Sequence, residues 1–450
     1  MLKQRRWFWV ALIVLITGWI SFWLYRASAD FPPSLRLPDE GSIGEMGPII
    51  LEFPGSVERS KVEAAWYLEP SVKGRFEWHG RQLWFWPQTG LQPDQVYTLG
   101  LRVGWKIDQR GLANQEVRFT INVRAPRLLY LGTPNASPEV YSVTLDGRDV
   151  KQLTHTGGQV LEFAASPDGK YIAFSMRNAQ GGTDIGLVNR AGQDQRVLSS
   201  CGRDSCRYPV WSPNGRWVTF IRMTQAGGEI RSAIWSYDFD ERRLIQVLDA
   251  PNVALSQPTW SPDGNFLAAY DEQAQGIRIV GREGRENALI PTNVSQRPRW
   301  SWDSQRLFFI VENNAGLIPY HEAYVADLEN RTTRRLFAGM SQTWDVSIPA
   351  ESPDGQWLVV GMRILNGPVN KQLWLFPVES LDTATEGVPI MTEVMINAAG
   401  YQWEPAGRAL VYQQIDLSSS DAQPQIVVWW RDVNQPRVIA KEGAFPAWLP

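Results

Sequence analysis

Apolar and polar residues alternate over short stretches along most of this chain, and turn-forming residues separate the stretches. Apolar runs such as WVTFI at 217–221 and FLAAY at 266–270 follow turn residues, PNG at 213–215 and PDGN at 262–265. This pattern is typical of β-strands, whereas apolar residues at helical spacing are rare beyond the N-terminus. The pattern therefore predicts an all-β protein with many tight turns.

One stretch, WSPDGNFLAAY at 260–270, recurs along the chain in recognisable variants. The positions equivalent to its tryptophan are Ala165, Trp211, Trp260, Trp300, Glu351, Trp403 and Trp448, with separations of 46, 49, 40, 51, 52 and 45 residues. In each unit a strand ends at this position, a Ser-Pro-Asp-Gly type turn follows, and three more strands come after it. A period of 40–50 residues built from strands predicts a β-propeller with four antiparallel strands in each blade.

The recurrence assigns structural roles to residues that would look catalytic in a single copy. We interpret Asp168, Asp263 and Asp354 as turn residues, because Asp caps such turns and the following Gly takes the left-handed position. The tryptophans that we interpret as packing residues between blades are Trp211, Trp260, Trp300, Trp403 and Trp448. A catalytic residue is normally needed once, so a pattern that recurs around a ring favours a scaffold.

The repeat resembles that of TolB-type β-propellers, whose hallmark is a WSPDG turn followed by an apolar strand. The resemblance covers about residues 127–450 and implies the fold rather than the function, because this fold serves unrelated functions. Residues 127–155 read as second, third and fourth strands, and GAFPAWLP at 443–450 reads as a lone first strand. We therefore expect a seven-bladed propeller over 126–450, with N- and C-terminal strands closing one blade; six blades is the alternative.

The first 26 residues have the pattern of a membrane anchor. Residues 1–6 form a basic tail, and residues 7–25 carry no charge, a length of about 28 Å as a helix that matches the hydrocarbon thickness. The positive-inside rule places the tail in the cytoplasm, so we expect a transmembrane signal anchor at 7–26 and an extracytoplasmic bulk. The alternative is a secreted protein cleaved near Ala29, within the small residues ASA.

Residues 27–125 predict a stalk and a separate β-domain. Short strand-like segments, one of them at 63–70, alternate with turn signals. The segment LQPDQVY at 91–97 and the D-x-x-G pattern at 108–111 resemble those of bacterial Ig-like β-sandwiches. The resemblance implies a spacer module.

The charge and motif content restrict the chemistry of the chain. A formal net charge of −3 gives no general attraction to nucleic acid. The sequence contains no G-x-S-x-G, H-E-x-x-H or P-loop motif, and we expect no catalytic residue, cofactor or metal site. Cys201 and Cys206 predict a disulfide in an oxidising compartment, with two free thiols as the alternative.

Long and dissimilar connections between strands form the candidate binding surface. They are residues 177–184, 199–209, 223–232, 312–322, 363–372 and 414–425. Irregular loops on a rigid scaffold often carry binding, although tolerated insertion is an equal alternative. We expect a non-catalytic scaffold for an extracytoplasmic protein or glycan. The alternatives are a propeller-funnel enzyme of lyase or lactonase type, and a ligand sensor that works through a membrane partner.

Overall fold

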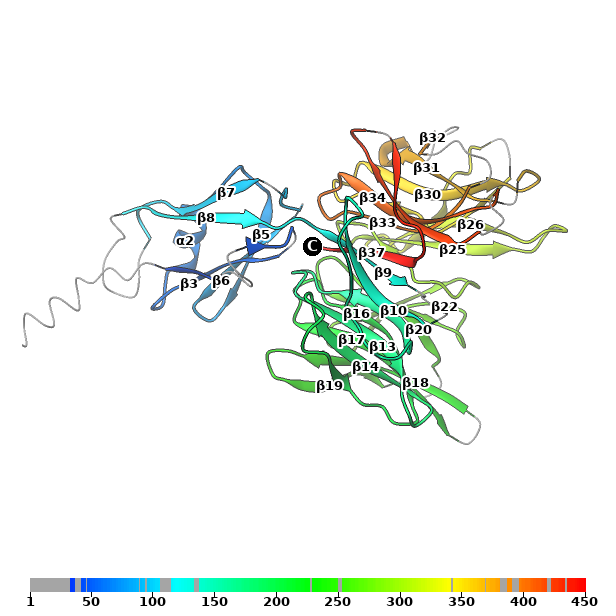
Figure 1. The fold of residues 1–450 in the computed structure, drawn as a ribbon, viewed down its shortest axis with the longest axis horizontal. Coiled ribbons are helices and arrows are strands. Elements are labelled where there is room, and N and C mark those ends of the chain that lie inside the picture. Colours follow the sequence, from blue (N-terminus) through cyan, green and yellow to red (C-terminus); the bar gives the residue numbers. More distant parts are fainter. Residues whose placement is uncertain are drawn as a thin grey trace, which may run out of the picture. The chain divides into compact units, whose positions relative to one another are not determined.

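Figure 1 shows the fold of the chain in a computed structural model. The described residues are 33–36, 42–45, 47–88, 90–93, 95–105, 115–132, 137–226, 229–249, 253–340, 343–368, 370–380, 387–390, 396–418, 422–433 and 435–450. The chain divides into two compact units, which we describe separately. Unit 1 comprises Met1–Ile43, Pro48–Gln88 and Gln95–Val123, and unit 2 comprises Gly44–Gly47, Thr89–Asp94 and Arg124–Pro450.

The expected anchor at 7–26, its basic tail and the cleavage site at Ala29 lie outside the described residues. Within the described ranges, no helix has the length and apolar character that crossing a membrane requires.

Unit 1 contains two four-stranded sheets and one short helix among its described residues. The first sheet has the order β1 (Ser34–Arg36), β3 (Ile49–Glu52), β6 (Gln82–Pro87) and β5 (Gly74–His79). The second has the order β2 (Ser42–Ile43), β8 (Val117–Val123), β7 (Val96–Leu101) and β4 (Trp66–Glu69). Burial alternates along β3, whose Ile49 and Leu51 are fully buried, so this strand shows one face to a core.

The prediction of a strand over 63–70 is wrong for residues 63–65. Helix α2 (Arg59–Ala65) occupies these residues and buries Val62 and Ala65, and strand β4 begins only at Trp66. The segment RSKVEAA consists mainly of good helix formers, and Lys61 forms an ion pair with Glu58 three residues earlier. Local helix propensity therefore overrides the apparent strand alternation here.

Unit 2 is a succession of antiparallel four-stranded sheets, the arrangement of a β-propeller (Figure 1). The first sheet has the order β11 (Val150–Gln152), β10 (Glu139–Thr144), β9 (Arg127–Gly132) and β37 (Ala444–Leu449). The next two are β12 (Val160–Ala165), β13 (Tyr171–Arg177), β14 (Thr183–Asn189), β15 (Arg196–Ser199), and β16 (Ser205–Trp211), β17 (Trp217–Ala226), β18 (Glu229–Asp238), β19 (Arg243–Asp249). One parallel pair, Thr183 with Ser205, joins these two sheets.

The remaining sheets follow in chain order. They are β20 (Leu255–Trp260), β21 (Phe266–Asp271), β22 (Gly276–Gly281), β23 (Glu286–Pro291); then β24 (Arg299–Trp300), β25 (Arg306–Asn313), β26 (Tyr320–Asp327), β27 (Thr332–Arg335). After them come β28 (Trp344–Val346) and β29 (Ala350–Glu351), which both pair with β30 (Trp357–Ile364), followed by β31 (Gln372–Pro377) and β32 (Val388–Pro389). The last sheet is β33 (Ile396–Trp403), β34 (Ala409–Asp416), β35 (Pro424–Trp430) and β36 (Pro436–Ala440).

The last strand of the chain completes the first sheet of unit 2. Strand β37 pairs antiparallel with β9, and Trp448 lies opposite Leu128. Both residues belong to a buried cluster that also contains Val411 and Val428 of the preceding sheet. The core of unit 2 is thus made of apolar layers between neighbouring sheets, and each layer draws on two blades.

Candidate functional site

Three of the repeat turns hold their shape through an aspartate. Asp263 accepts hydrogen bonds from the Ser261 hydroxyl (2.6 Å) and from the Asn265 N–H (3.0 Å), and Gly264 follows at φ +71°. Asp168 and Asp354 accept the same pair of bonds from the serine two residues before and the N–H two residues after. All three carboxylates are bonded within their own turns, and Asp354 also accepts a hydrogen bond from Arg431 at 2.9 Å.

The repeat tryptophans are buried, and each indole N–H reaches the preceding blade. Trp211, Trp300, Trp403 and Trp448 donate to backbone carbonyls of Ala164, Thr259, Ala350 and Gln402, at 3.0–3.4 Å. Trp260 donates instead to the Thr219 hydroxyl at 3.1 Å and stacks on Trp217. These contacts join neighbouring sheets and leave no indole free for a ligand among these five.

Glu351 occupies the position at which the repeat has tryptophan. Trp302, in the turn of the preceding repeat, contacts it in place of the missing indole. The Glu351 carboxylate accepts the Trp302 backbone N–H (2.9 Å) and an Arg306 guanidinium N–H (2.9 Å). The Trp302 indole in turn donates to the Glu351 carbonyl at 3.2 Å. Burial raises the pKa of Glu351, and these donors oppose the rise. The sequence offered a signal for this exchange, since SWDS replaces SPDG at 301–304 in the repeat before.

Cys201, which follows β15, and Cys206, which lies in β16, form a disulfide with Cα atoms 6.2 Å apart. Both side chains are buried, in a cluster with Ile185 and Leu187 of the neighbouring strand β14. The bond closes a short loop upon itself. It therefore stiffens the segment 201–206 but does not cross to another sheet.

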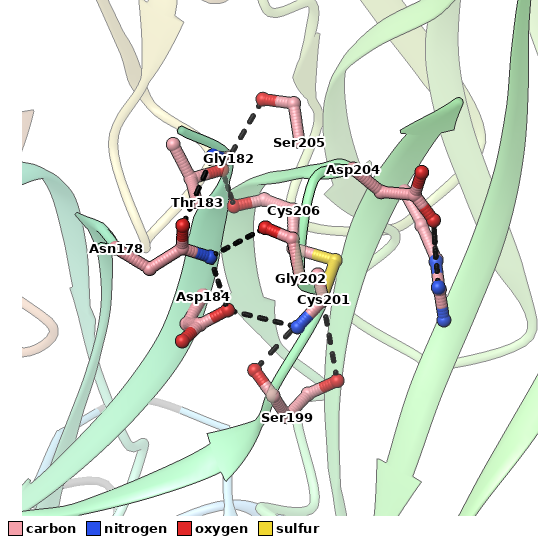
Figure 2. The surroundings of a disulfide bond; sticks show 11 residues. Asn178, Gly182, Thr183, Asp184, Ser199, Cys201, Gly202, Asp204, Ser205 and Cys206 are labelled. Atoms are coloured by element: carbon pink, nitrogen blue, oxygen red, sulfur yellow. Dashed lines mark hydrogen bonds and ion pairs between the residues drawn. A yellow bond between two sulfur atoms is a disulfide. The ribbon is translucent and has the colours of Figure 1, made fainter. Parts of the chain in front are cut away.

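Asn178 and Asp184 attach this disulfide loop to the preceding blade (Figure 2). The buried Asp184 carboxylate accepts hydrogen bonds from the Cys201 N–H and the Asn178 amide, both at 2.8 Å. The Asn178 amide also donates to the Gly202 carbonyl at 2.8 Å, and its oxygen accepts the Gly182 N–H at 2.9 Å. The two predicted loops 177–184 and 199–209 are thus one hydrogen-bonded assembly, which we name the loop knot.

Thr183 and Gly182 complete the loop knot. The Thr183 N–H donates to the Asp204 carbonyl at 3.1 Å, and its hydroxyl donates to the Cys206 carbonyl at 2.9 Å. A Cβ atom on Gly182 would lie 2.2 Å from the Asp204 carbonyl oxygen, so only glycine fits this close approach. The sequence indicated the connection 177–184 but singled out none of Asn178, Gly182 and Asp184, because this stretch has no repeat pattern.

A second charged cluster ties the loops 312–322 and 363–372 to strand β28. Asp345 accepts the His321 N–H at 3.0 Å and the Arg363 Nε–H at 2.8 Å, and the Lys371 ammonium lies 3.2 Å away. Burial would raise the pKa of Asp345, but the hydrogen bonds from His321 and the nearby Lys371 charge hold it well below its usual range. The carboxylate therefore stays ionised and anchors both connections.

Several predicted loops are shorter than the sequence indicated, because the strands extend into them. Residues 223–226 and 229–232 pair as the ends of β17 and β18. Strand β25 runs to Asn313 and β26 starts at Tyr320, which leaves 314–319 as the connection. The pairing of long hairpin arms supplies backbone hydrogen bonds that the polar composition of these segments concealed. Within the described ranges no group of three or more His, Cys, Asp or Glu is placed to hold a metal ion.

No family model matches the chain. The Tol-Pal system protein TolB of Rhizorhabdus wittichii is 34% identical over 85 residues, 18% of this chain and 17% of that protein. The TolB homolog of Chlorobium chlorochromatii is 27% identical over 151 residues, 33% of this chain and 31% of that protein. The uncharacterized peptidase YuxL of Bacillus subtilis is 28% identical over 156 residues, 35% of this chain and 22% of that protein. The chain thus spans less than a third of the length of these relatives.

Solved structures resemble the chain at low identity. TolB of Acinetobacter baumannii has 15% identity and a TM-score of 0.42, over 70% of this chain and 79% of that one. An oligogalacturonate lyase of Vibrio parahaemolyticus has 12% identity and a TM-score of 0.50, over 70% of this chain and 85% of that one. The latter likeness concerns the fold alone. With the sequence relatives, it supports a TolB-like β-propeller.

Proposed function

We propose that this chain is an extracytoplasmic, membrane-anchored propeller that binds a partner protein without catalysing a reaction. In this proposal segment 7–26 is the anchor, the β-domain of 27–125 is an Ig-like spacer, and the propeller has seven blades. The pairing of β37 with β9 supports the blade count, because it makes a four-stranded sheet from the two ends of unit 2.

The observation that carries the proposal is a set of exposed aliphatic side chains on the connections from second to third strands. Leu317, Ile318 and Leu417 on these connections, and Ile230 and Ile364 at the strand ends beside them, are all exposed, and Leu317 is completely so. In a propeller these connections lie on the same face of the ring, because corresponding strands run in the same direction in every blade. Aliphatic side chains on structured tips are suited to a protein surface, and less so to a sugar, which favours aromatic faces and polar donors.

The loop knot and the Asp345 cluster add rigidity to this face. A loop that is already ordered loses less conformational entropy on binding than a free one. The relatives named as Tol-Pal system proteins agree with a role in a protein assembly.

A photo-crosslinking amino acid at position 317 tests the proposal in cells that express the full chain. We expect the crosslinker at 317 to capture one discrete protein. In a second version of the chain the crosslinker stands at 315, and the same crosslinked protein should disappear when Leu317→Ser and Ile318→Ser are combined there. The matched control is Val433→Ser, an exposed valine on a turn from third to fourth strand, which lies on the opposite face. Loss of the crosslink in both variants, or equal crosslinking from position 265 on that opposite face, counts against a binding face.

The topology is tested separately with alkaline phosphatase fused after residue 450. Activity of the fusion in intact cells supports an extracytoplasmic propeller. An inactive fusion that remains full-length rejects the anchor orientation, whatever the crosslinking result.

A further inference from the structure

The innermost strand of several blades carries a bulge at the same place, directly before the repeat tryptophan. The pairing register shifts in β16, β20, β33 and β37. At each shift one residue has positive φ: Tyr208 (59°), Gln257 (55°), Gly400 (58°) and Phe445 (54°). Such bulges re-aim side chains and are enriched next to functional sites. Arg297 is the residue at the corresponding position of its repeat, three residues before Trp300.

A direct contact shows that the inner strands approach one another across the propeller axis. The Arg299 guanidinium on β24 donates to the Tyr401 carbonyl on β33 at 2.8 Å and lies 4.7 Å from the centre of the Tyr401 ring. A complete sheet, β28 to β32, stands between these two strands in chain order. Because their sheets are not consecutive, Arg299 reaches Tyr401 through the centre of the ring.

The same region holds an ion pair between two further inner strands. The Arg207 Nε atom of β16 lies 2.8 Å and 3.0 Å from the two carboxylate oxygens of Glu162 on β12, and the Nη2 atom also contacts this carboxylate. Both side chains are half-buried. The bidentate geometry commits the Glu162 carboxylate to Arg207.

Arg297 has no such partner. It makes no hydrogen bond or ion pair with another described residue, although Glu162, Tyr208 and Arg299 all lie near enough to affect its charge. Burial lowers the pKa of Arg297, and the positive charge of Arg299 adds to this, whereas Glu162 and Tyr208 oppose it. Yet the side chain is exposed to solvent. Arg297 therefore lies close to the inner strands that approach one another at the axis, because its repeat position matches the bulges and Arg299 two residues on reaches Tyr401.

The charges of these arginines do not cancel. Glu162 pairs with Arg207, and no carboxylate of a described residue pairs with Arg297 or Arg299, which leaves two positive charges without a partner. A charged group in the interior is costly unless an opposite charge accompanies it. The excess therefore predicts an anion that is bound at the axis.

We propose that Arg297 and Arg299 form a binding site on the propeller axis for a small oxyanion, a carboxylate or phosphate group of a soluble ligand. Arg297 supplies the free guanidinium, whose planar fork matches two oxygens of such a group. Arg299 holds a fixed position through Tyr401 and adds its charge. This site is independent of the partner-binding face, because it lies on inner strands rather than on the exposed connections.

Isothermal titration of the purified full chain tests the site with sodium phosphate and sodium citrate as probes, against sodium chloride at matched ionic strength. We expect saturable binding of phosphate or citrate, and the stronger of the two identifies the oxyanion class. Arg297→Gln should weaken this binding about 10- to 100-fold, because a charged hydrogen-bonding partner is lost. Arg297→Lys should retain part of it. The matched control, Arg243→Gln, removes the same charge from the outer strand β19 and should leave binding unchanged.

A second measurement keeps the proposal open to refutation if the variants differ in stability. Without any oxyanion, Arg297→Gln should raise the melting temperature, since it removes an uncompensated charge beside Arg299. With saturating phosphate or citrate, the wild-type protein should gain more in melting temperature than the variant. The site is rejected if neither probe binds above the chloride background, if Arg297→Gln binds as tightly as the wild type, or if this variant is less stable without ligand.

Discussion

Replacement of Asn178 by alanine should detach the disulfide loop from the neighbouring blade. The Asn178 side chain makes four hydrogen bonds: to the Asp184 carboxylate, to the Gly202 carbonyl, and from the N–H groups of Gln180 and Gly182. The bond to the Asp184 carboxylate contributes about 1.5 kcal/mol, and the other three together contribute about 1.5 kcal/mol, since they are partly exposed. The expected loss is about 3 kcal/mol of local stability.

Amide hydrogen exchange measures this loss where it occurs. A loss of about 3 kcal/mol in the opening free energy speeds exchange about 100-fold for amides that are protected by the same assembly. We expect this acceleration at the N–H groups of Gly182 and Cys201, which donate to Asn178 and Asp184. The disulfide remains intact in the variant, so any acceleration reports on the attachment between blades and not on closure of the loop.

The matched control is Asn189→Ala. Asn189 also bonds through both amide atoms, to Asp194 and from the Gln193 N–H, but only within its own hairpin. This variant should leave exchange at Gly182 and Cys201 as in the wild type. The reasoning is refuted if Asn178→Ala leaves the Gly182 and Cys201 amides equally protected, or if the control accelerates them to the same degree.

Three further predictions concern stability. Replacing Cys201 and Cys206 together by serine should lower the free energy of unfolding by about 2 kcal/mol in denaturant, because the closure entropy of a six-residue loop is lost. A reducing agent should lower the free energy of unfolding of the wild type but not that of the variant. Burial would raise the pKa of Asp238, but hydrogen bonds from Arg216 and Trp217 lower it to about 2. Asp238→Asn should therefore lower the free energy of unfolding by about 2 kcal/mol at pH 7, and by progressively less as the pH falls from about 4 to 2. A stability difference between the variant and the wild type that stays constant over this pH range contradicts the assignment. Trp260→Phe should cost about 1–2 kcal/mol in the same unfolding assay, because the buried Thr219 hydroxyl loses its indole donor, whereas Trp78→Phe at a half-buried site in unit 1 should cost less.

The sequence predicted the all-β character because the relevant signals are local. The aspartate, glycine and serine of a repeat turn lie within five residues of one another, and their roles follow from turn geometry alone. Helix α2 was missed for the opposite reason: seven residues give too short a stretch for helical periodicity to stand out. The loop lengths were overestimated because polar residues such as Glu229 and Arg231 pair in a hairpin as readily as apolar ones.

The residues of greatest functional interest were the least visible in the sequence, and the repeat itself explains why. A repeat is recognised by the residues that its copies share. These shared residues have structural roles common to the blades, such as the turn aspartate and the tryptophan between sheets. Function at one place on a ring needs a residue that differs between copies while its backbone position stays the same. The position three residues before the tryptophan holds Tyr208, Gln257, Arg297 and Phe445 in different blades, and Tyr208, Gln257 and Phe445 share a bulge with positive φ. A search of repeat proteins for function should therefore align the copies and examine the positions where geometry is kept and chemistry is not.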